Sequence, residues 1–304
     1  MTRYAYFGGQ FVPADQAKVS IATHAFNYGT ACFEGLRAYW SEPAQQLFIF
    51  RPIEHYERLL RSARLLLMDV GLTAQQMTDI TVELLRKEGF REDTYIRPLA
   101  YKADEGIGVR LHGIRDAFAM FAVPFGEYLP VKAGAKAGVS SWRRVDDNAV
   151  PARAKITGAY INSALAKSEA LLNGFDEAIV LTQDGHVSEG SAENIFVVRN
   201  GELLTPPVSD NILEGITRST IIEIAQRELG IRTVERPIDR SELYGADEVF
   251  FAGTGVQVVP VIEIDRRPVG TGARGPLTAR LETLYFDIVR GLLPKYRAWC
   301  VPVY

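Results

Sequence analysis

The hydrophobic residues of the first 125 positions fall into short runs that predict strands. Tyr4–Phe7 and Gln10–Val12 flank a Gly-Gly pair, which is typical of a β-hairpin. Leu47–Phe50 is a continuous apolar run of the kind found in buried strands. Tyr95–Tyr101 and Phe118–Val123 carry the same signal, so we expect at least five strands in this part of the chain.

Two helices are predicted between these strands. From about Ile53 to Asp69, apolar side chains recur every three to four positions, which indicates a helix with one buried face. Thr73 is followed by Gln76 three residues later, the spacing of a capping box at a helix start. Gly89 stands where that second helix should end.

The second half of the chain mixes strands and helices. Gly138–Trp142 reads as a strand and Gly158–Leu172 as a helix. Ala178–Leu181 and Asn194–Val198 are apolar runs separated by a turn-rich stretch, and we predict that they form a hairpin.

A further helix is predicted from Thr217 to Gly230, and a strand over Glu248–Phe251. The elements do not alternate strictly, so the expected fold class is α+β or mixed α/β. Since 304 residues approach the limit of a single core, we expect two domains. The predicted division is a small domain 1–125, a linker 126–136 where Gly, Pro, Ala and Lys replace the apolar runs, and a large domain 137–304.

Composition narrows the class of protein. The chain is 47% hydrophobic and 23% charged, as in ordinary globular proteins, and its net charge of -3 argues against a nucleic-acid partner. Cys32 and Cys300 lie too far apart for a disulfide framework or metal-ligand spacing. The apolar runs are too short to span a membrane, and no signal-peptide pattern is visible. We therefore expect a soluble, cytoplasmic protein.

Several common catalytic motifs are missing from the sequence. The four histidines form no metal-type cluster, and there is no HExxH, CxxC, GxSxG or Walker motif. Gly106-Ile107-Gly108 lacks the third glycine of a dinucleotide-binding fingerprint. Hydrolase, metalloenzyme and dinucleotide-binding functions are therefore disfavoured.

Two glycine-containing loops have the composition of anion sites. Leu213–Thr220 places a glycine and two threonines at a helix start, where free N–H groups favour phosphate. A plain threonine N-cap explains this stretch equally well. Gly253–Gly255 follows a predicted strand and could form a nest of N–H groups, although a tight exit from the strand is the simpler interpretation.

Two charged residues could carry chemistry. Lys155 has small apolar neighbours, which can lower a lysine pKa and make the amine a nucleophile, whereas a solvated lysine at a helix start is the simpler interpretation. Glu189 precedes a buried strand and could hold a pyridinium nitrogen, and an exposed hairpin acid is the simpler alternative. Glu193 and Asn194 are expected to order their loop by side-chain hydrogen bonds to the backbone.

Taken together and in this order, the motifs resemble the class IV (fold-type IV) aminotransferases, and most closely the branched-chain amino acid aminotransferases. The resemblance covers nearly the whole chain. It rests on the segments His24–Gly29, Phe33–Arg37, Tyr95–Pro98, Gly106–Val109, the surroundings of Lys155, Ser188–Gly190, Gly215–Thr217, Gly253–Thr254, Tyr285–Val289 and Pro294–Arg297.

The resemblance implies a two-domain fold with pyridoxal 5'-phosphate bound between the domains. Lys155 would form a Schiff base with the cofactor and move the proton, Glu189 would pair with the pyridine nitrogen, and Tyr160 would hydrogen-bond the phenolate oxygen. The phosphate and its surroundings would be contacted by Arg58, Leu213, Gly215, Ile216, Thr217, Gly253 and Thr254. Taken alone, the sequence favours a surface helix arginine at Arg58.

The same resemblance implies a site for branched-chain L-amino acids, 2-oxoglutarate and their products. Tyr95 and the backbone at Thr254–Gly255 would hold the α-carboxylate, and Arg97 the distal carboxylate of glutamate. The apolar side chain would be enclosed by Phe33, Gly35, Phe125, Tyr128 and Tyr160, with Tyr28 and Val109 supplied by the neighbouring subunit of a homodimer or of an oligomer of dimers. For Phe33 and Phe125, ordinary core packing is the alternative.

The sequence departs from the family pattern at two places. Asn27 stands where many relatives have His, and Gly255-Val256-Gln257 replaces the usual small-small-acidic run. These changes leave open a D-amino acid or (R)-amine aminotransferase, or an aminodeoxychorismate lyase, on the same fold. A non-catalytic binding or scaffold protein is a third possibility, which intact Lys155 and Glu189 disfavour.

Overall fold

The computed structural model describes residues 3–126, 129 and 133–304, and its chain divides into two compact units. The first unit comprises residues 1–126, 154–159 and 287–304, and the second comprises 127–153 and 160–286. The contacts therefore group the chain differently from the division at 126–136 that the composition suggested. Two later segments, 154–159 and 287–304, pack with the first unit, and residues 135–136 already belong to a strand.

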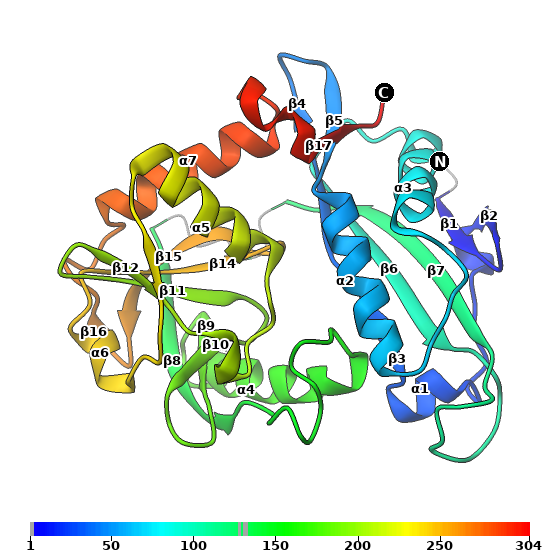
Figure 1. Ribbon diagram of the computed structural model, residues 1–304, viewed down its shortest axis with the longest axis horizontal. Coiled ribbons are helices and arrows are strands. Elements are labelled where there is room, and N and C mark those ends of the chain that lie inside the picture. Colours follow the sequence, from blue (N-terminus) through cyan, green and yellow to red (C-terminus); the bar gives the residue numbers. More distant parts are fainter. Residues whose placement is uncertain (1–2, 127–128, 130–132) are drawn as a thin grey trace. The chain divides into compact units, whose positions relative to one another are not determined.

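The first unit contains an eight-stranded antiparallel sheet in the order β17-β5-β4-β6-β7-β1-β2, with β3 also paired to β6. The last strand of the chain lies beside β5, at the edge of the sheet (Figure 1). The bounds are β1 Tyr4–Phe7, β2 Gln10–Pro13, β3 Ala31–Phe33, β4 Leu36–Ser41, β5 Gln46–Phe50, β6 Thr94–Lys102, β7 Asp116–Pro124 and β17 Cys300–Pro302.

The predicted strands of this unit are confirmed. Along β6, buried and half-buried residues alternate without a break, because successive side chains of a strand point to opposite faces. Thr94, Ile96, Pro98, Ala100 and Lys102 therefore face one side of the sheet, and Tyr95 and Arg97 the other. This alternation places both predicted substrate-binding residues of β6 on the same face.

The helices of the first unit are α1 (His24–Tyr28), α2 (Pro52–Leu65) and α3 (Ala74–Glu88). The capping box of Thr73 and Gln76 is confirmed, and Gly89 ends α3 in the left-handed conformation at φ 66°. The expected end of α2 at Asp69 was wrong. Leu67 adopts φ 53°, which a helix does not tolerate, so α2 stops at Leu65 and a turn follows.

The second unit contains a nine-stranded mixed sheet in the order β10-β9-β8-β15-β14-β11-β12-β13, with β16 beside β15. The pairs β8–β9, β8–β15 and β12–β13 are parallel, so the expected mixed α/β class is confirmed. The strands are β8 Ala135–Arg143, β9 Glu177–Leu181, β10 Val187–Gly190, β11 Asn194–Arg199, β12 Glu202–Thr205, β13 Thr233–Glu235, β14 Glu248–Gly253, β15 Gln257–Ile264 and β16 Arg267–Pro268.

The predicted hairpin of the second unit was wrong in its pairing. Both of its strands exist, but β9 pairs with β8 and β10, whereas β11 pairs with β12 and β14. Strand β10 could not be predicted from the hydrophobic pattern, because its residues Ser188 and Glu189 are polar and yet buried. A strand without apolar residues at these positions has no hydrophobic signal.

Helices α4 (Tyr160–Leu172), α5 (Ile216–Leu229) and α6 (Arg240–Tyr244) belong to the second unit, and α7 (Pro276–Val289) begins there. A short 3-10 turn over Thr157–Ala159 precedes α4, and Gly230 ends α5 as expected. The stacked rings of Phe196 and Phe250, 4.9 Å apart, join β11 to β14 in the core of this sheet.

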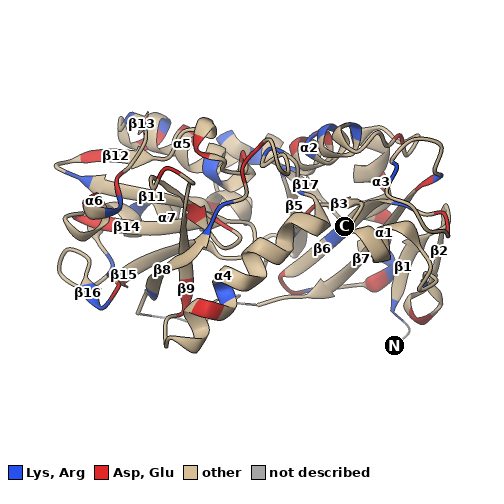
Figure 2. Ribbon diagram, turned by 90° about the horizontal axis from the view of Figure 1, so that it is seen from below, with Lys and Arg blue, Asp and Glu red and all other residues tan. Residues whose placement is uncertain are grey.

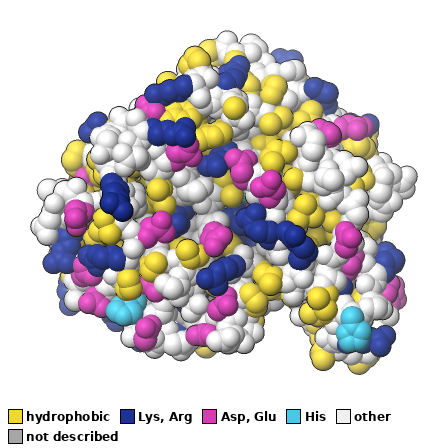
Figure 3. Space-filling view, viewed as in Figure 1, with side chains coloured by type: hydrophobic (Ala, Val, Ile, Leu, Met, Phe, Trp, Pro, Cys, Tyr) yellow, Lys and Arg dark blue, Asp and Glu magenta, His cyan; other side chains and the backbone are white. Residues whose placement is uncertain are grey.

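Charged residues of both signs are distributed over the molecule. On the face seen in Figure 3, Lys and Arg side chains are interspersed with Asp and Glu, in keeping with the net charge of -3. In the described part of the chain, no helix is long and apolar enough to cross a membrane. The same residues contain no group of three His, Cys, Asp or Glu side chains that could hold a metal ion.

Candidate active site

Lys155 belongs to the first unit, although it follows the predicted linker in the sequence. Its backbone N–H donates to Ser62 Oγ at 3.2 Å, and its carbonyl accepts the N–H of Phe33 at 3.0 Å. The side-chain amine lies 5.1 Å from the centre of the Phe33 ring. Lys155 is half-buried rather than solvated, so its amine is held in an apolar setting beside the sheet.

Tyr95 and Arg97 form a linked pair on the same face of β6. The Nε and Nη2 groups of Arg97 donate to the Tyr95 hydroxyl at 3.2 and 3.0 Å. The Arg97 guanidinium lies 4.5 Å from the Phe33 ring centre, so Phe33 stacks against both Arg97 and the Lys155 amine. Gly35 permits this arrangement, because a Cβ there would clash with the Tyr95 hydroxyl.

Phe125 extends this aromatic surface. Its ring centre is 5.3 Å from that of Tyr95 and 4.9 Å from the guanidinium carbon of Arg37. Arg37 is buried and also donates from Nη2 to the carbonyl of Gly126 at 2.7 Å. Tyr128, predicted to line the same pocket, lies outside the described residues.

In the first unit, Tyr28 is hydrogen-bonded to Gly108, the residue before Val109. The N–H of Gly108 donates to the Tyr28 hydroxyl at 3.0 Å, and His24 Nε2 lies 2.8 Å from the Gly108 carbonyl. Val109 is 77% exposed, which is unusual for a valine. The neighbouring Asn27 donates from Nδ2 to the carbonyls of Ile21 and Thr23, so the residue that departs from the family pattern braces the chain at α1.

Arg58 is buried, with 4% of its surface exposed, so the alternative of a surface helix arginine is wrong. Three arginines lie on α2, which Figure 2 shows with several basic segments. The Nε and Nη2 groups of Arg58 donate to the two oxygens of Glu34 at 2.6 and 2.9 Å. His55 Nδ1 lies 2.8 Å from Glu34 Oε2.

The charges in this cluster follow from the balance between its burial and its close contacts. Burial raises the pKa of Glu34, but the Arg58 charge and the hydrogen bonds from His55 and Arg58 outweigh it, so the pKa lies well below its ordinary range. Burial lowers the pKa of His55, and the hydrogen bond to Glu34 offsets this only in part. The cluster therefore holds an ionised Glu34, a charged Arg58 and a neutral His55.

Glu189 is buried on β10 in the second unit, so the alternative of an exposed hairpin acid is wrong. Arg144 Nη2 lies 2.8 Å from Oε1 of Glu189. Oε2 accepts from Asn194 Nδ2 at 3.0 Å and from the N–H of Leu213 at 3.1 Å. These donors stabilise the ionised carboxylate and fix its direction.

The two residues expected to order this loop behave differently. Asn194 Nδ2 also donates to the Leu213 carbonyl at 2.9 Å, which confirms its role. The expectation for Glu193 was wrong, because its carboxyl is buried instead of binding backbone N–H groups of the described residues. Burial and the neighbouring Glu177 carboxylate raise the pKa of Glu193 well above its ordinary value.

The loop before α5 lies against the same residues. Gly215 is the N-cap of α5, and no side chain in the described chain caps that helix, so the alternative of a threonine N-cap is wrong. Thr217 is buried in the first turn. A Cβ on Gly215 would clash with Asn194 Oδ1, so only glycine allows the loop to approach Asn194 this closely.

Gly253, Thr254 and Gly255 lead into the turn of a hairpin between β14 and β15. Gly253 pairs with Gln257, the first residue of β15, and Gln257 takes the left-handed φ of 64°. A Cβ on Gly253 would lie 3.0 Å from Glu193 Cβ, so this turn also packs closely on the segment that carries Asn194. The simple interpretation of a tight strand exit is thus correct for the backbone.

Comparison with known proteins matches residues 31–264 to the model of amino-transferase class IV. The chain is 51% identical to a probable branched-chain-amino-acid aminotransferase of Aquifex aeolicus, over 99% of this chain and 97% of the relative. It is 39% identical to the branched-chain-amino-acid aminotransferase of Escherichia coli, over 97% and 96% of the two chains.

The chain belongs to the class IV aminotransferases, among the branched-chain-amino-acid aminotransferases. This confirms the resemblance drawn from its motifs.

Solved structures of this family have the same fold over their full length. The branched-chain aminotransferase of Thermoproteus uzoniensis, solved with norvaline, superimposes with a TM-score of 0.96 at 47% identity and 100% coverage of both chains. The branched-chain amino acid aminotransferase of Thermobaculum terrenum, solved in its PLP-form, gives a TM-score of 0.94 at 36% identity, over 100% of this chain and 99% of that one. The expected fold-type IV architecture is thereby confirmed.

Sequence reasoning missed four residues that contact predicted site residues of this branched-chain aminotransferase: Glu34, His55, Ser62 and Arg144. Glu34 and His55 had a signal, since a carboxylate between Phe33 and Gly35 and a histidine on the apolar side of α2 are both unusual in a core. Arg144 has none, because it precedes its partner Glu189 by 45 positions (189 minus 144) and only the sheet brings them together.

Proposed function

We propose that this enzyme transfers amino groups between the branched-chain L-amino acids Leu, Ile and Val and 2-oxoglutarate, using pyridoxal 5'-phosphate. The observation that carries the proposal is the grouping of Lys155, Phe33, Tyr95 and Arg97. A primary amine, an aromatic wall, a hydroxyl and a guanidinium lie together beside strands β3 and β6. Relatives solved with pyridoxamine phosphate and with 4-methylvaleric acid support the same chemistry.

The residues fit the cofactor. Pyridoxal phosphate supplies an electron-withdrawing ring that stabilises negative charge at the substrate Cα. Lys155 supplies the amine that binds the cofactor aldehyde and later carries the proton. Glu189, oriented by Arg144, Asn194 and the Leu213 N–H, supplies a fixed carboxylate that keeps a ring nitrogen protonated.

We assign the other cofactor contacts from the family resemblance. Tyr160, the first residue of α4, would donate to the phenolate oxygen. Gly215 leaves the α5 N–H groups without a capping side chain among the described residues, which suits a phosphate accepting from Ile216 and Thr217. The remaining phosphate contacts proposed are Arg58, Leu213, Gly253 and Thr254.

We assign substrate selection to the aromatic wall and one cation. Phe33, Phe125 and Tyr128 would enclose an aliphatic side chain, and Gly35 leaves room for it. Arg97 would bind the distal carboxylate of glutamate, while Tyr95 and the backbone of Thr254–Gly255 hold the shared α-carboxylate. Leu, Val and Ile should then react at similar rates, because one methylene changes the barrier by only ~1–3 kcal/mol.

A panel of half-reactions tests this proposal. Coloured enzyme is mixed with L-Leu, L-Val, L-Ile, L-Glu, D-Ala or (R)-1-phenylethylamine, and the loss of the cofactor absorption band is followed. We expect the four L-amino acids to react and the other two to leave the band unchanged. Rapid reaction with D-Ala or the (R)-amine, and none with L-Leu, would instead support the alternative substrates.

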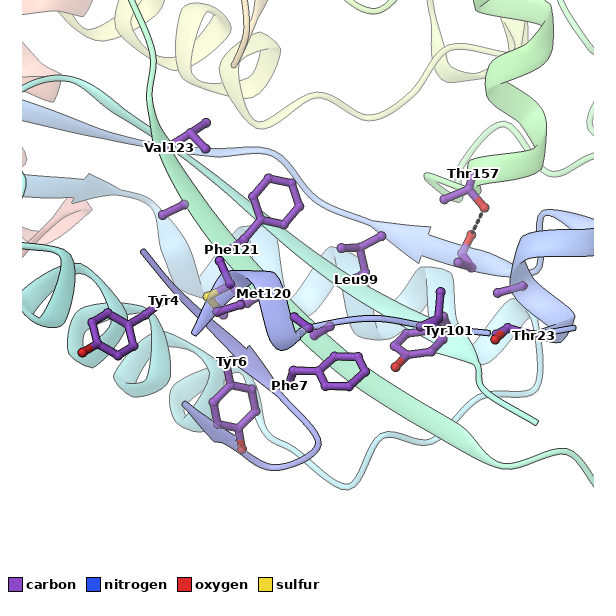
Figure 4. A pocket seen from close by; sticks show the side chains of 18 of the residues that line it. Tyr4, Tyr6, Phe7, Thr23, Leu99, Tyr101, Met120, Phe121, Val123 and Thr157 are labelled. Atoms are coloured by element: carbon purple, nitrogen blue, oxygen red, sulfur yellow. Dashed lines mark hydrogen bonds between the residues drawn. The ribbon is translucent and has the colours of Figure 1, made fainter. Parts of the chain in front are cut away.

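We further propose that the enzyme works as a homodimer in which each subunit contributes Tyr28 and Val109 to the active site of its partner. A hollow of about 790 Å³ opens on the first unit, lined almost entirely by apolar and aromatic side chains (Figure 4). Its lining includes Phe26 of α1, which is 69% exposed, and Ile107 beside Val109 is 92% exposed. Apolar surface of this extent is typical of a protein interface, and a second copy is the partner we propose.

Mixed dimers test this arrangement. Lys155→Ala and a disabling Tyr28 variant are each inactive alone, but a mixed dimer holds one site with an intact Lys155 and an intact Tyr28. Activity should return on mixing, once mass spectrometry of tagged chains shows that subunits exchange. If exchange occurs without any return of activity, each Tyr28 serves its own chain.

A further inference from the structure

We propose that Glu34 and His55 act as a positioning pair that directs the Arg58 guanidinium toward the cofactor phosphate. The inference rests on the proposed function, which assigns Arg58 to the phosphate, and it adds the two residues that orient it. All of the contacts lie within the first unit.

The Glu34 carboxylate is saturated with donors. Oε1 accepts from Arg58 Nε at 2.6 Å. Oε2 accepts from Arg58 Nη2 at 2.9 Å, from His55 Nδ1 at 2.8 Å and from the N–H of Gly35 at 3.2 Å. With 0% of its surface exposed, Glu34 cannot exchange these partners for water. Its own backbone is fixed to the sheet, since its N–H donates to the Pro98 carbonyl at 3.0 Å.

This geometry fixes the Arg58 fork along one edge. Two of its nitrogens, Nε and Nη2, donate to Glu34, and these two bonds fix the orientation of the guanidinium plane. The other edge of the fork is the one we assign to the phosphate. Without Glu34, Arg58 would have several rotamers and would lose side-chain entropy when it binds the anion.

His55 completes the pair through its hydrogen bond to Glu34, which holds the carboxylate in place. It is buried on the same face of α2 as Arg58, three residues earlier. Because burial keeps its pKa low and the ring neutral, it adds a hydrogen bond without a second positive charge beside Arg58. The carboxylate thus balances one cation only.

The same helix face is tied to the catalytic lysine. Ser62 lies four residues after Arg58 and accepts the backbone N–H of Lys155 at 3.2 Å. Phe33, next to Glu34, donates its N–H to the carbonyl of Lys155 at 3.0 Å. Helix α2 and the end of β3 therefore hold both the Lys155 backbone and the Arg58 guanidinium. These contacts set the spacing between the lysine amine and the arginine cation.

The test compares pyridoxal phosphate with pyridoxal, which lacks the phosphate. Dissociation constants for both are measured on the full-length apoenzyme of wild type and of Glu34→Gln. A glutamine oxygen can accept from one Arg58 nitrogen but not present a second anionic oxygen to the other. We expect Glu34→Gln to bind pyridoxal phosphate about tenfold more weakly or worse, with pyridoxal affinity unchanged.

A matched control is the Asp93–Arg290 pair of the same unit, in which both Arg290 terminal nitrogens donate to one carboxylate at 3.1 and 2.9 Å. Asp93→Asn removes the same charge and should change neither dissociation constant. His55→Asn keeps a donor near the Nδ1 position and should bind as wild type, whereas His55→Leu should weaken pyridoxal phosphate alone.

Three results would overturn the inference. If Glu34→Gln binds pyridoxal phosphate as tightly as the wild type or more tightly, Glu34 only offsets the positive charge of Arg58 and does not orient it. Equal losses for both ligands would indicate general damage to the fold. If Glu34→Gln does not fold, the two His55 variants decide, and identical behaviour of His55→Asn and His55→Leu refutes the pair. Arg58→Met tests the underlying assignment separately: no phosphate-specific loss there removes Arg58 from the phosphate site, while wild-type binding through Lys155 keeps the proposed function intact.

Discussion

Each unit of this enzyme contains a buried carboxylate–arginine pair, and the two pairs are used in opposite ways. In the first unit, Glu34 is enclosed by Arg58, His55 and a backbone N–H, and we propose that the arginine is the group that binds the ligand. In the second unit, Glu189 is held by Arg144, Asn194 and Leu213, and we propose that the carboxylate is the group that acts. The same kind of pair is thus assigned opposite roles, with the arginine binding the ligand in the first unit and the carboxylate binding it in the second.

The difference lies in how the arginine meets the carboxylate. Arg58 donates to both oxygens of Glu34, which also accepts from His55 and the Gly35 N–H. At Glu189, Arg144 Nη2 lies 2.8 Å from Oε1, while Oε2 accepts from Asn194 and the Leu213 N–H. These donors hold the Glu189 carboxylate in one direction, which suits the partner of a protonated ring nitrogen that we propose.

The largest effect should come from removing the amine to which we assign the covalent bond with the cofactor. Lys155→Ala should abolish transamination and leave the fold intact, because only a primary amine can bind the cofactor aldehyde covalently. Activity and circular dichroism are measured together. Turnover near that of the wild type, without added amine, would show that Lys155 is not the catalytic residue.

Removing the acting charge of the second unit should have the next largest effect. Glu189→Gln should slow proton transfer in the half-reaction by orders of magnitude, since a neutral carboxamide does not keep the ring nitrogen protonated. Single-turnover spectroscopy with L-Leu gives the rate. An unchanged rate would remove the distinction between the two pairs, because Glu189 would then be only structural.

Arg97 sharpens the comparison, since in the structure its guanidinium donates to a hydroxyl rather than to a carboxylate. Arg97→Ala should impair the L-Glu half-reaction by about 2–4 kcal/mol in excess of the L-Leu one, or roughly 30- to 800-fold. The ratio of the two single-turnover efficiencies is the measurement. Equal losses would mean that Arg97 binds the shared α-carboxylate or only shapes the pocket.

The smallest effect should be a dependence of stability on pH that originates in the first pair. The folded pKa of His55 lies below its ordinary 6.5 and that of Glu34 below its ordinary 4.5. The unfolded chain therefore binds protons first, so stability is present above these values and is lost as the pH falls. The His55→Asn variant should lose less stability than the wild type when the pH falls from about 7 to about 5. Thermal melting at each pH is the measurement. A wild type that becomes more stable on acidification would contradict the assigned charges.

The local elements of this protein could be predicted wherever one short-range signal determined them. The hairpin at Gly8-Gly9, the capping box at Thr73 and the helix end at Gly230 depend on residues within a few positions of each other. The order of motifs along the chain also sufficed to place it in its family. These features are local or serial, so the sequence carries them directly.

The tertiary structure alone decided which residues are neighbours. No spacing in the sequence predicts that Arg144 would meet Glu189, that Lys155 would pack with the first unit, or that β10 would lie beside β9 while its polar residues are buried. Arg58 and Glu189 each favoured an exposed interpretation when read singly, because a charged residue is rarely buried without a partner. Their partners come from distant strands, helices and loops, and only the folded sheets bring those partners within hydrogen-bonding distance.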